Sequence, residues 1–327
     1  MKKNSILKVG VIGVGHLGKF HVEQYQNIHN VECIGVFDLD TQASSNISEK
    51  YNISSFDNLD GILRACDAVS ICTPTSTHFT VAKQALELDC HVFIEKPITN
   101  NIEEAQKLIL LSAEQNKVVQ VGHIERFNPA FCAFNKDLVK PEFIESHRLA
   151  PFNIRGTDVD VILDLMIHDI DILLHIIQSK IKKINASGVS VLSKTIDMAN
   201  TRIEFDSGCV ANLTASRISQ KKLRKFRIFE EKVYTNIDFL NPCVETYMLS
   251  EKQPTEDCSY LVVNKNSEKY ILYDKPTIVS HNALRVELES FVHSIEGGVD
   301  PIVSASDGLA ALGVAVQIRE QIQSKNN

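Results

Sequence analysis

The segment Gly13-Val14-Gly15-His16-Leu17-Gly18 constrains the possible folds of this chain more than any other feature of its sequence. It follows an apolar run, 7–12, that is typical of a short buried strand, and it leads into a run with helical spacing, 17–26. A second strand-like run, 31–37, ends at Asp38, which lies 20 positions after Gly18. A strand, a glycine turn, a helix, a strand and an acidic residue in this order predict a βαβ unit that binds a dinucleotide.

Each residue of the glycine turn has a physical role in such a unit. Gly13 permits the tight turn out of the strand, Gly15 lets the backbone approach a pyrophosphate, and Gly18 lets the helix pack closely on the sheet. The start of the helix, at His16 and Leu17, presents N–H groups and a partial positive charge to the phosphates. We expect these residues to bind the cofactor; the alternative is a βα turn with incidental glycines.

Asp38 indicates which dinucleotide is bound. Its carboxylate is expected to accept hydrogen bonds from a ribose diol, and its negative charge would repel a 2′-phosphate. The sequence therefore favours NAD over NADP as the cofactor.

Length and composition limit the class of protein. A chain of 327 residues favours two domains, and a hydrophobic content of 44% is ordinary for a globular protein. No apolar run approaches the ~20 residues that span a bilayer, and Met1–Ser5 leave no room for a signal peptide, so we expect a cytoplasmic protein. The net charge of −7 argues against nucleic-acid binding. The eight cysteines include no CxxC pair, so we expect reduced thiols and no zinc ribbon.

The order of the predicted elements divides the chain near residue 122. Up to that point strands and helices alternate, which predicts a parallel sheet with helices on both faces, a Rossmann domain over residues 1–122. Further strands are expected at 68–72, 92–94 and 118–121, and further helices at 59–65, 79–88 and 102–115.

Residues 123–327 show a different pattern, in which strand-like segments follow one another and predict an α+β domain on a mostly antiparallel sheet. Its helices are expected at 163–177, 282–295 and 304–322, and its strands at 184–191, 199–205, 209–216, 225–229 and 233–239. Turns are expected at Asp206-Ser207-Gly208 and Glu230-Glu231-Lys232. The last two helices can pack back on the first domain. An uncovered face of the sheet would favour a homodimer or homotetramer.

Two polar clusters follow predicted strands of the first domain, at the sheet edge where open parallel sheets bind ligands. Thr73-Pro74-Thr75 with His78 follows the strand 68–72, and we expect Thr73, Pro74 or His78 to contact the dinucleotide. Glu95-Lys96-Pro97 follows the strand 92–94, which places Lys96 near the nicotinamide with Glu95 tuning its charge. The alternatives are an ordinary turn before a helix and a solvated ion pair at a strand end.

The predicted helix 163–177 is apolar almost all round, which indicates burial, yet it carries Asp164, His168, Asp171 and His175. Asp164 and His168 are four residues apart and share a helix face. Buried charge is costly unless it is paired or used, and a histidine beside a carboxylate suits proton transfer near neutral pH. The alternatives are a satisfied buried pair without a catalytic role and a metal site formed by the two His and two Asp.

Together and in this order, these clusters resemble the Gfo/Idh/MocA family of NAD(P)-dependent oxidoreductases, also called the glucose–fructose oxidoreductase family. The resemblance covers essentially the whole chain. It rests on the glycine turn, Thr73-Pro74 with His78, Glu95-Lys96-Pro97, Asp164-x-x-x-His168, the Asp206-Ser207-Gly208 turn and Ser216-Arg217.

The resemblance implies roles for three of these residues. Lys96 would contact both the substrate hydroxyl and the cofactor, and Asp164 and His168 would line the substrate site, with His168 as the usual acid/base. Lys96, Asp164 and His168 are therefore the expected catalytic set, and the sequence leaves open whether Lys96 or His168 is the principal base. The family often has a glycine pair before the Asp and a glycine between the Asp and the His; Val161-Ile162 and Met166 stand there instead, so the local pocket shape is expected to differ.

The segments 121–129 and 163–169 resemble the branch of the family that oxidises a hydroxyl of a UDP-sugar for lipid A biosynthesis. Arginines suit phosphate oxygens because of their forked donors, and four are candidates for diphosphate or uracil contacts. Arg126 and Arg155 are the expected substrate ligands, with Arg148 and Arg217 as further candidates. Two other functions stay open: a dehydrogenase of a free sugar or inositol, and a non-catalytic protein that senses NAD(H), although the intact Lys, Asp and His argue against the second.

Overall fold

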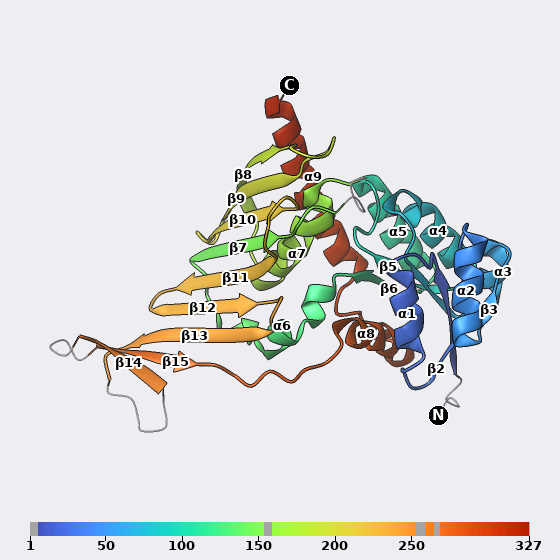
Figure 1. Ribbon diagram of the computed structural model, residues 1–327, viewed down its shortest axis with the longest axis horizontal. Coiled ribbons are helices and arrows are strands. Elements are labelled where there is room, and N and C mark those ends of the chain that lie inside the picture. The colour runs from blue at the N-terminus through green and yellow to red at the C-terminus, as the bar shows by residue number, and fades with distance from the viewer. Residues whose placement is uncertain (1–5, 154–158, 253–258, 265–268, 327) are drawn as a thin grey trace. The chain divides into compact units, whose positions relative to one another are not determined.

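The computed structural model describes residues 6–153, 159–252, 259–264 and 269–326 (Figure 1). The chain forms two compact units, one made of residues 1–127 and 282–313 and the other of residues 128–281 and 314–327. Among the described residues, no helix is both long enough and apolar enough to cross a bilayer.

The first unit contains a six-stranded parallel sheet in the order β3-β2-β1-β4-β5-β6. Its strands are β1 (Leu7–Ile12), β2 (Val31–Phe37), β3 (Ser54–Ser55), β4 (Ala68–Ile71), β5 (His91–Glu95) and β6 (Val119–Gly122). Its helices up to residue 127 are α1 (Gly18–Tyr25), α2 (Thr41–Tyr51), α3 (Leu59–Ala65), α4 (Thr75–Glu87), α5 (Ile102–Glu114) and the short 3₁₀ helix η1 (Ile124–Phe127). Strands β2 and β3 lie on one side of β1, and β4 to β6 lie on the other. The strand order therefore switches between β1 and β4, and open α/β sheets bind ligands at such a switch point.

The predicted strands and helices of this unit are confirmed, with differences at two helices. Helix α4 begins at Thr75, four residues before the predicted start, because Pro74 serves as its N-cap. Helix α2 is not indicated by the sequence pattern, since its segment is rich in Ser, Thr and Asn. Its start depends on Asp40, whose side chain accepts hydrogen bonds from the N–H groups of Gln42 and Ala43, both at 3.1 Å.

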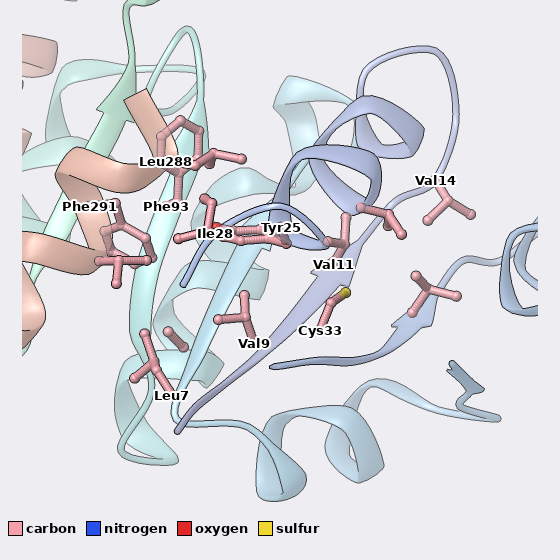
Figure 2. Packing of buried hydrophobic residues seen from close by; sticks show 14 residues of the cluster. Leu7, Val9, Val11, Val14, Tyr25, Ile28, Cys33, Phe93, Leu288 and Phe291 are labelled. Carbon is pink, nitrogen blue, oxygen red and sulfur yellow. The ribbon is translucent and has the colours of Figure 1, made fainter. Parts of the chain in front are cut away.

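Helix α8 (Ala283–Gly297) belongs to this unit although it lies late in the chain. Its residues Leu288, Phe291 and Val292 are buried in the same hydrophobic cluster as residues of β1 and α1 (Figure 2). The ring of Phe291 meets that of Phe93 edge-on, with the centroids 5.9 Å apart. Residues distant in sequence thus complete the core under the cofactor-binding segment.

The second unit is built on a nine-stranded sheet in the order β14-β15-β13-β12-β11-β7-β10-β9-β8. Among the described strands of this sheet, β7 and β10 form the one parallel pair, so the sheet is mostly antiparallel, as predicted. Its strands are β7 (Phe143–Leu149), β8 (Ile181–Val189), β9 (Met198–Phe205), β10 (Val210–Ser216), β11 (Leu223–Glu230), β12 (Val233–Asp238), β13 (Cys243–Ser250), β14 (Ser259–Asn264) and β15 (Lys269–Asp274). The helical segments are α6 (Pro129–Ala133), η2 (Lys136–Leu138), η3 (Ile162–Met166), α7 (Ile167–Ile176) and the later part of α9 (Ala305–Asn326).

Both predicted turns join antiparallel strands. Gly208 has a φ of +91° in the β9–β10 turn, and Lys232 has a φ of +65° in the β11–β12 turn. Five strands, β3 in the first unit and β7 and β13 to β15 in this one, were not indicated by the sequence pattern. At the far edge of the sheet the side chain of Gln321, from α9, hydrogen-bonds the backbone of β8 at Ala186 N and Ile184 O.

Replacing Phe291 by Ala is expected to lower the free energy of unfolding by about 3–5 kcal/mol, because a fully buried ring leaves a cavity against Phe93. Urea denaturation followed by circular dichroism measures this change. The matched control is Leu110→Ala, at a side chain that is 64% exposed, where a change below about 0.5 kcal/mol is expected. Equal effects of the two substitutions would contradict the packing described for α8.

Candidate active site

The glycine turn has the geometry that a dinucleotide pyrophosphate needs. Gly13 has a φ of +84°, and a Cβ at Gly18 would lie 1.8 Å from the carbonyl oxygen of Gly13, so α1 starts closer to β1 than any side chain allows. A Cβ at Gly15 would meet no atom within 4 Å, so the space in front of it is open. No side chain caps α1, whose N-cap is Leu17, and the adjacent His16 is exposed. The residues present therefore fit a bound dinucleotide.

Asp38 lies at the end of β2 and is tied to the glycine turn. Its Oδ2 accepts a hydrogen bond from the N–H of Val14 at 2.7 Å, and its Oδ1 accepts one from the N–H of Asp40 at 2.9 Å. The carboxylate is half-buried, so it is fixed in place and still accessible from one side. A carboxylate in this position suits a ribose diol.

His78, on α4, is buried between the two loops that follow β4 and β5. Its Nδ1 lies 2.9 Å from the carbonyl oxygen of Pro97, and its Nε2 lies 2.9 Å from the carbonyl oxygen of Thr73. Burial lowers the pKa of His78, although the hydrogen bonds to Pro97 and Thr73 oppose this effect. Thr73 is held further by its hydroxyl, which accepts a hydrogen bond from Thr77 Oγ1 at 2.8 Å. The structure therefore joins the two polar clusters that the sequence places at this sheet edge.

Glu95, the last residue of β5, has its carboxylate in the core directly before Lys96. Its Oε1 lies 2.9 Å from Nε2 of His21, a buried residue of α1. A Cβ at Gly122 would lie 3.0 Å from Oε2, so this glycine makes room for the carboxylate. Burial alone would raise the pKa of Glu95, but the hydrogen bond and charge of His21, with the charge of Lys96, lower it below its usual value. No pattern in the sequence indicates His21 as this partner.

Asp164 and His168 lie on one continuous helical segment of the second unit. The segment begins with a π-helical turn, η3, rather than the α-helix expected from the sequence, and continues as α7. Asp160 caps its start, because its Oδ1 accepts hydrogen bonds from the N–H groups of Ile162 and Leu163, both at 3.0 Å. Asp164 and His168 are half-buried. π-Helical turns often occur at functional sites.

The remaining polar residues of this segment have other surroundings. Asp171 is buried, and the ring of His175 lies with its centroid 6.0 Å from that of Phe131. Within the part of the chain that the structure describes, no group of three or more His, Cys, Asp or Glu side chains is placed to hold a metal ion.

Arg148, on β7, forms a two-pronged ion pair with Asp169, the residue after His168. The distances are 2.8 Å from Nε to Oδ2 and 3.0 Å from Nη2 to Oδ1, and both side chains are buried. Such a pair leaves the fork of Arg148 engaged with a carboxylate. Its geometry is that of a residue that holds α7 on the sheet.

Arg217 supports the start of the same segment. Its Nε lies 3.2 Å from Oδ1 of Asp197, and its Nη2 donates to the carbonyl oxygen of Val159 at 2.7 Å. Asp197 also accepts three backbone hydrogen bonds, from residues 191 to 193, at 2.7–2.9 Å. Sequence reasoning did not find this pairing, because the two residues are 20 positions apart, with Asp197 directly before β9 and Arg217 directly after β10.

Of the other two candidate arginines, the structure describes Arg126 and not Arg155. Arg126 lies in η1, where its side chain is 2% exposed and its Nη2 is 3.9 Å from Oδ1 of Asp307. Arg155 lies outside the described residues.

The glycine turn, the acid at the end of β2 and the second unit, which is α+β, define the class of protein, a two-domain dinucleotide-dependent oxidoreductase. The family model "Oxidoreductase family, NAD-binding Rossmann fold" matches residues 7–123, and "GFO/IDH/MocA C-terminal domain" matches residues 142–233. The chain belongs to the Gfo/Idh/MocA family, which confirms the resemblance seen in its sequence, and its cofactor is NAD.

Relatives along the whole chain agree with this assignment. UDP-N-acetylglucosamine 3-dehydrogenase of Acidithiobacillus ferrooxidans is 34% identical over 319 residues, which cover 97% of this chain and 98% of that protein. A solved structure of that enzyme has a TM-score of 0.88, with 97% of this chain and 98% of that chain covered. The scyllo-inositol 2-dehydrogenase (NAD(+)) of Bacillus subtilis is 25% identical over 332 residues, covering 95% of this chain and 92% of that protein.

Replacing Asp197 by Asn is expected to lower the free energy of unfolding by about 3 kcal/mol at pH 7, because it breaks a buried ion pair with Arg217. Burial alone would raise the pKa of Asp197, but hydrogen bonds from Ser193 and the backbone lower it far below its usual value. Its contribution is therefore complete above the unfolded-state pKa and declines as the pH falls below it. The difference between wild type and variant should be smaller by about 1 kcal/mol at pH 3.

Urea denaturation at the two pH values measures these free energies. Asp137→Asn is the control, since this side chain is 81% exposed and pairs only with Lys136 among the ion pairs described, so little change is expected at either pH. A loss for Asp197→Asn that does not vary with pH would contradict the charged state assigned to this carboxylate.

Proposed function

We propose that this protein oxidises a hydroxyl of a UDP-sugar to a ketone by hydride transfer to NAD, in the manner of a UDP-N-acetylglucosamine 3-dehydrogenase. The observation that carries this proposal is the 34% identity to the Acidithiobacillus ferrooxidans enzyme over 97% of the chain, across both units. The role fits lipid A biosynthesis, where an amine can replace the new ketone.

Lys96, Asp164 and His168 are the proposed catalytic residues. His168, oriented by Asp164, takes the proton of the substrate hydroxyl, and the Lys96 ammonium hydrogen-bonds the same oxygen and stabilises its developing negative charge. NAD, when bound, accepts the hydride from the carbon. The alternative assignment makes Lys96 the principal base.

The proposed cofactor site consists of residues from four segments at the carboxyl ends of β1, β2, β4 and β5. The glycine turn and the start of α1 hold the pyrophosphate, through Gly13, Gly15, His16, Leu17 and Gly18. Asp38 binds the ribose diol and disfavours a 2′-phosphate, which supports NAD over NADP. Thr73, Pro74, His78, Glu95 and Lys96 form the part nearer the reacting atoms.

Substrate recognition is proposed to involve Arg126 and Arg155 in addition to Asp164 and His168. The buried pairing of Arg148 with Asp169, and of Arg217 with Asp197, supports a structural role for these two arginines in place of a diphosphate contact. Of the four candidate arginines, Arg126 and Arg155 therefore remain as the proposed diphosphate ligands.

The proposed division of labour assigns NAD binding to residues 1–122, and substrate binding and oligomerisation to residues 123–327. A row of half-buried aromatic rings crosses five strands of the nine-stranded sheet, and successive ring centroids are 4.9–5.8 Å apart. The row consists of Phe143, Phe229, Tyr234, Tyr247 and Tyr273. An aromatic surface of this kind supports a homodimer or homotetramer.

Purified protein with NAD and UDP-N-acetylglucosamine is expected to produce NADH, measured by absorbance at 340 nm. A transaminase and an amino donor are included, because a keto product can be unfavourable at equilibrium. Free sugars and inositols form the comparison panel. If NADH formed only with a free polyol, that polyol would be the substrate and the UDP-sugar proposal would be wrong. If the protein bound NADH but turned over no substrate, the result would favour an NAD(H)-sensing protein.

Lys96→Ala and His168→Ala are each expected to lower kcat by about 10²–10⁴-fold, because each removes a group that handles the proton or the charge of the reacting oxygen. NADH binding and the urea midpoint show whether each variant stays folded. Lys107→Ala and His29→Ala, at exposed positions, are the matched controls and should keep wild-type turnover. Near-normal kcat in both active-site variants would refute the proposed site.

A further inference from the structure

The ring of His78 links two loops that are 24 residues apart in sequence, measured from Thr73 to Pro97. Each ring nitrogen lies 2.9 Å from a backbone carbonyl oxygen, Nδ1 from that of Pro97 and Nε2 from that of Thr73. Pro97 follows Lys96 directly, and His78 is 1% exposed. The imidazole thus lies between the end of β4 and the loop that carries the proposed catalytic lysine.

Both partners of the ring are carbonyl oxygens, which accept hydrogen bonds and cannot donate them. A neutral imidazole has one N–H, so it can satisfy one of the two carbonyls. Burial lowers the pKa of His78, which favours the neutral ring at pH 7.5. The position of that single proton therefore decides which loop the ring holds.

The two contacts differ in their access to water. The contact with Pro97 is buried, whereas the contact with Thr73 is only partly buried. A buried carbonyl without a donor costs more free energy than one that water can reach. The proton is therefore best placed on Nδ1, where it bonds Pro97.

We propose that His78 is a positioning residue for Lys96, and that it acts through a hydrogen bond from Nδ1–H to the carbonyl oxygen of Pro97. This inference rests on the proposed function only in the role given to Lys96. Under this proposal His78 holds the loop of Lys96 and does not itself contact the dinucleotide. The backbone of the Lys96-Pro97 loop is held by α4, while the Glu95 carboxylate before it is held by α1 through His21. The carboxylate of Glu95 and the carbonyl of Pro97, on either side of Lys96, are thus each held by a buried histidine.

The first test measures the ring itself, without substrate. Two-dimensional ¹H–¹⁵N spectra of the histidine side chains at pH 7.5, assigned by loss of a signal in His78→Gln, report which nitrogen carries the proton. A proton on Nδ1 is expected. A ring protonated only on Nε2 would overturn the proposal, because it could not bond Pro97. This result does not depend on which sugar the enzyme oxidises.

The second test measures turnover with whichever substrate the panel identifies. His78→Leu is expected to lower kcat at least 10-fold while the dissociation constant of NADH changes less than 3-fold. His78→Gln keeps N–H donors in a side chain of similar size, and should restore at least part of the lost kcat. A parallel loss of kcat and NADH affinity, or no rescue by Gln in a folded variant, would overturn the positioning role.

His91→Gln is the matched control. His91 lies at the opposite end of β5, and its Nδ1 accepts a hydrogen bond from the N–H of Val118 at 3.0 Å. Burial lowers its pKa to about 4, so it is also a neutral, partly enclosed histidine of the same sheet. Wild-type kcat is expected for this variant. If the wild-type protein binds NADH and turns over no substrate, the proposed function fails while the spectra still test the hydrogen bond.

Discussion

The close approach of α1 to β1 is the constraint on which the cofactor region depends. A side chain at Gly18 would overlap the carbonyl of Gly13, so two glycines fix the distance between the first strand and the first helix. That distance places the N–H of Val14 against Asp38 and places His21 against Glu95. One steric requirement thus determines both the position of Asp38, the proposed ribose-binding acid, and the surroundings of Lys96, the proposed catalytic lysine.

The fold was largely predictable from the sequence because its strongest signals are local. Buried parallel strands such as β1 and β4 are mostly apolar runs. The turns at Gly208 and Lys232 lie in short polar segments between two strand-like runs. The strands that the sequence did not indicate are half-buried or partly polar, as in β7, where buried and half-buried residues alternate. The place of β7 comes from pairing with β10 and β11, which lie far along the chain.

The candidate site was predictable only in part, because residue types can be read along the chain and their partners cannot. The glycine turn and Asp38 are recognisable from their spacing, whereas Lys96 is recognisable from its place directly after a predicted strand and from the family resemblance. The pairs Arg148–Asp169 and Arg217–Asp197 each join residues about 20 positions apart, and no periodicity predicts which acid an arginine meets. The π-helical turn at Asp164 was equally hidden, since it differs from an α-helix by one residue per hydrogen bond.

The contact between α9 and β8 has a consequence for the edge of the nine-stranded sheet. β8 is the last strand of its sheet, and its outer backbone groups at Ile184 and Ala186 are occupied by Gln321 and Lys325. An unoccupied strand edge is a template for pairing with other chains. The final turns of α9 therefore shield this edge, and a chain shortened before Gln321 would expose a strand that a neighbouring molecule can extend into a continuous intermolecular sheet.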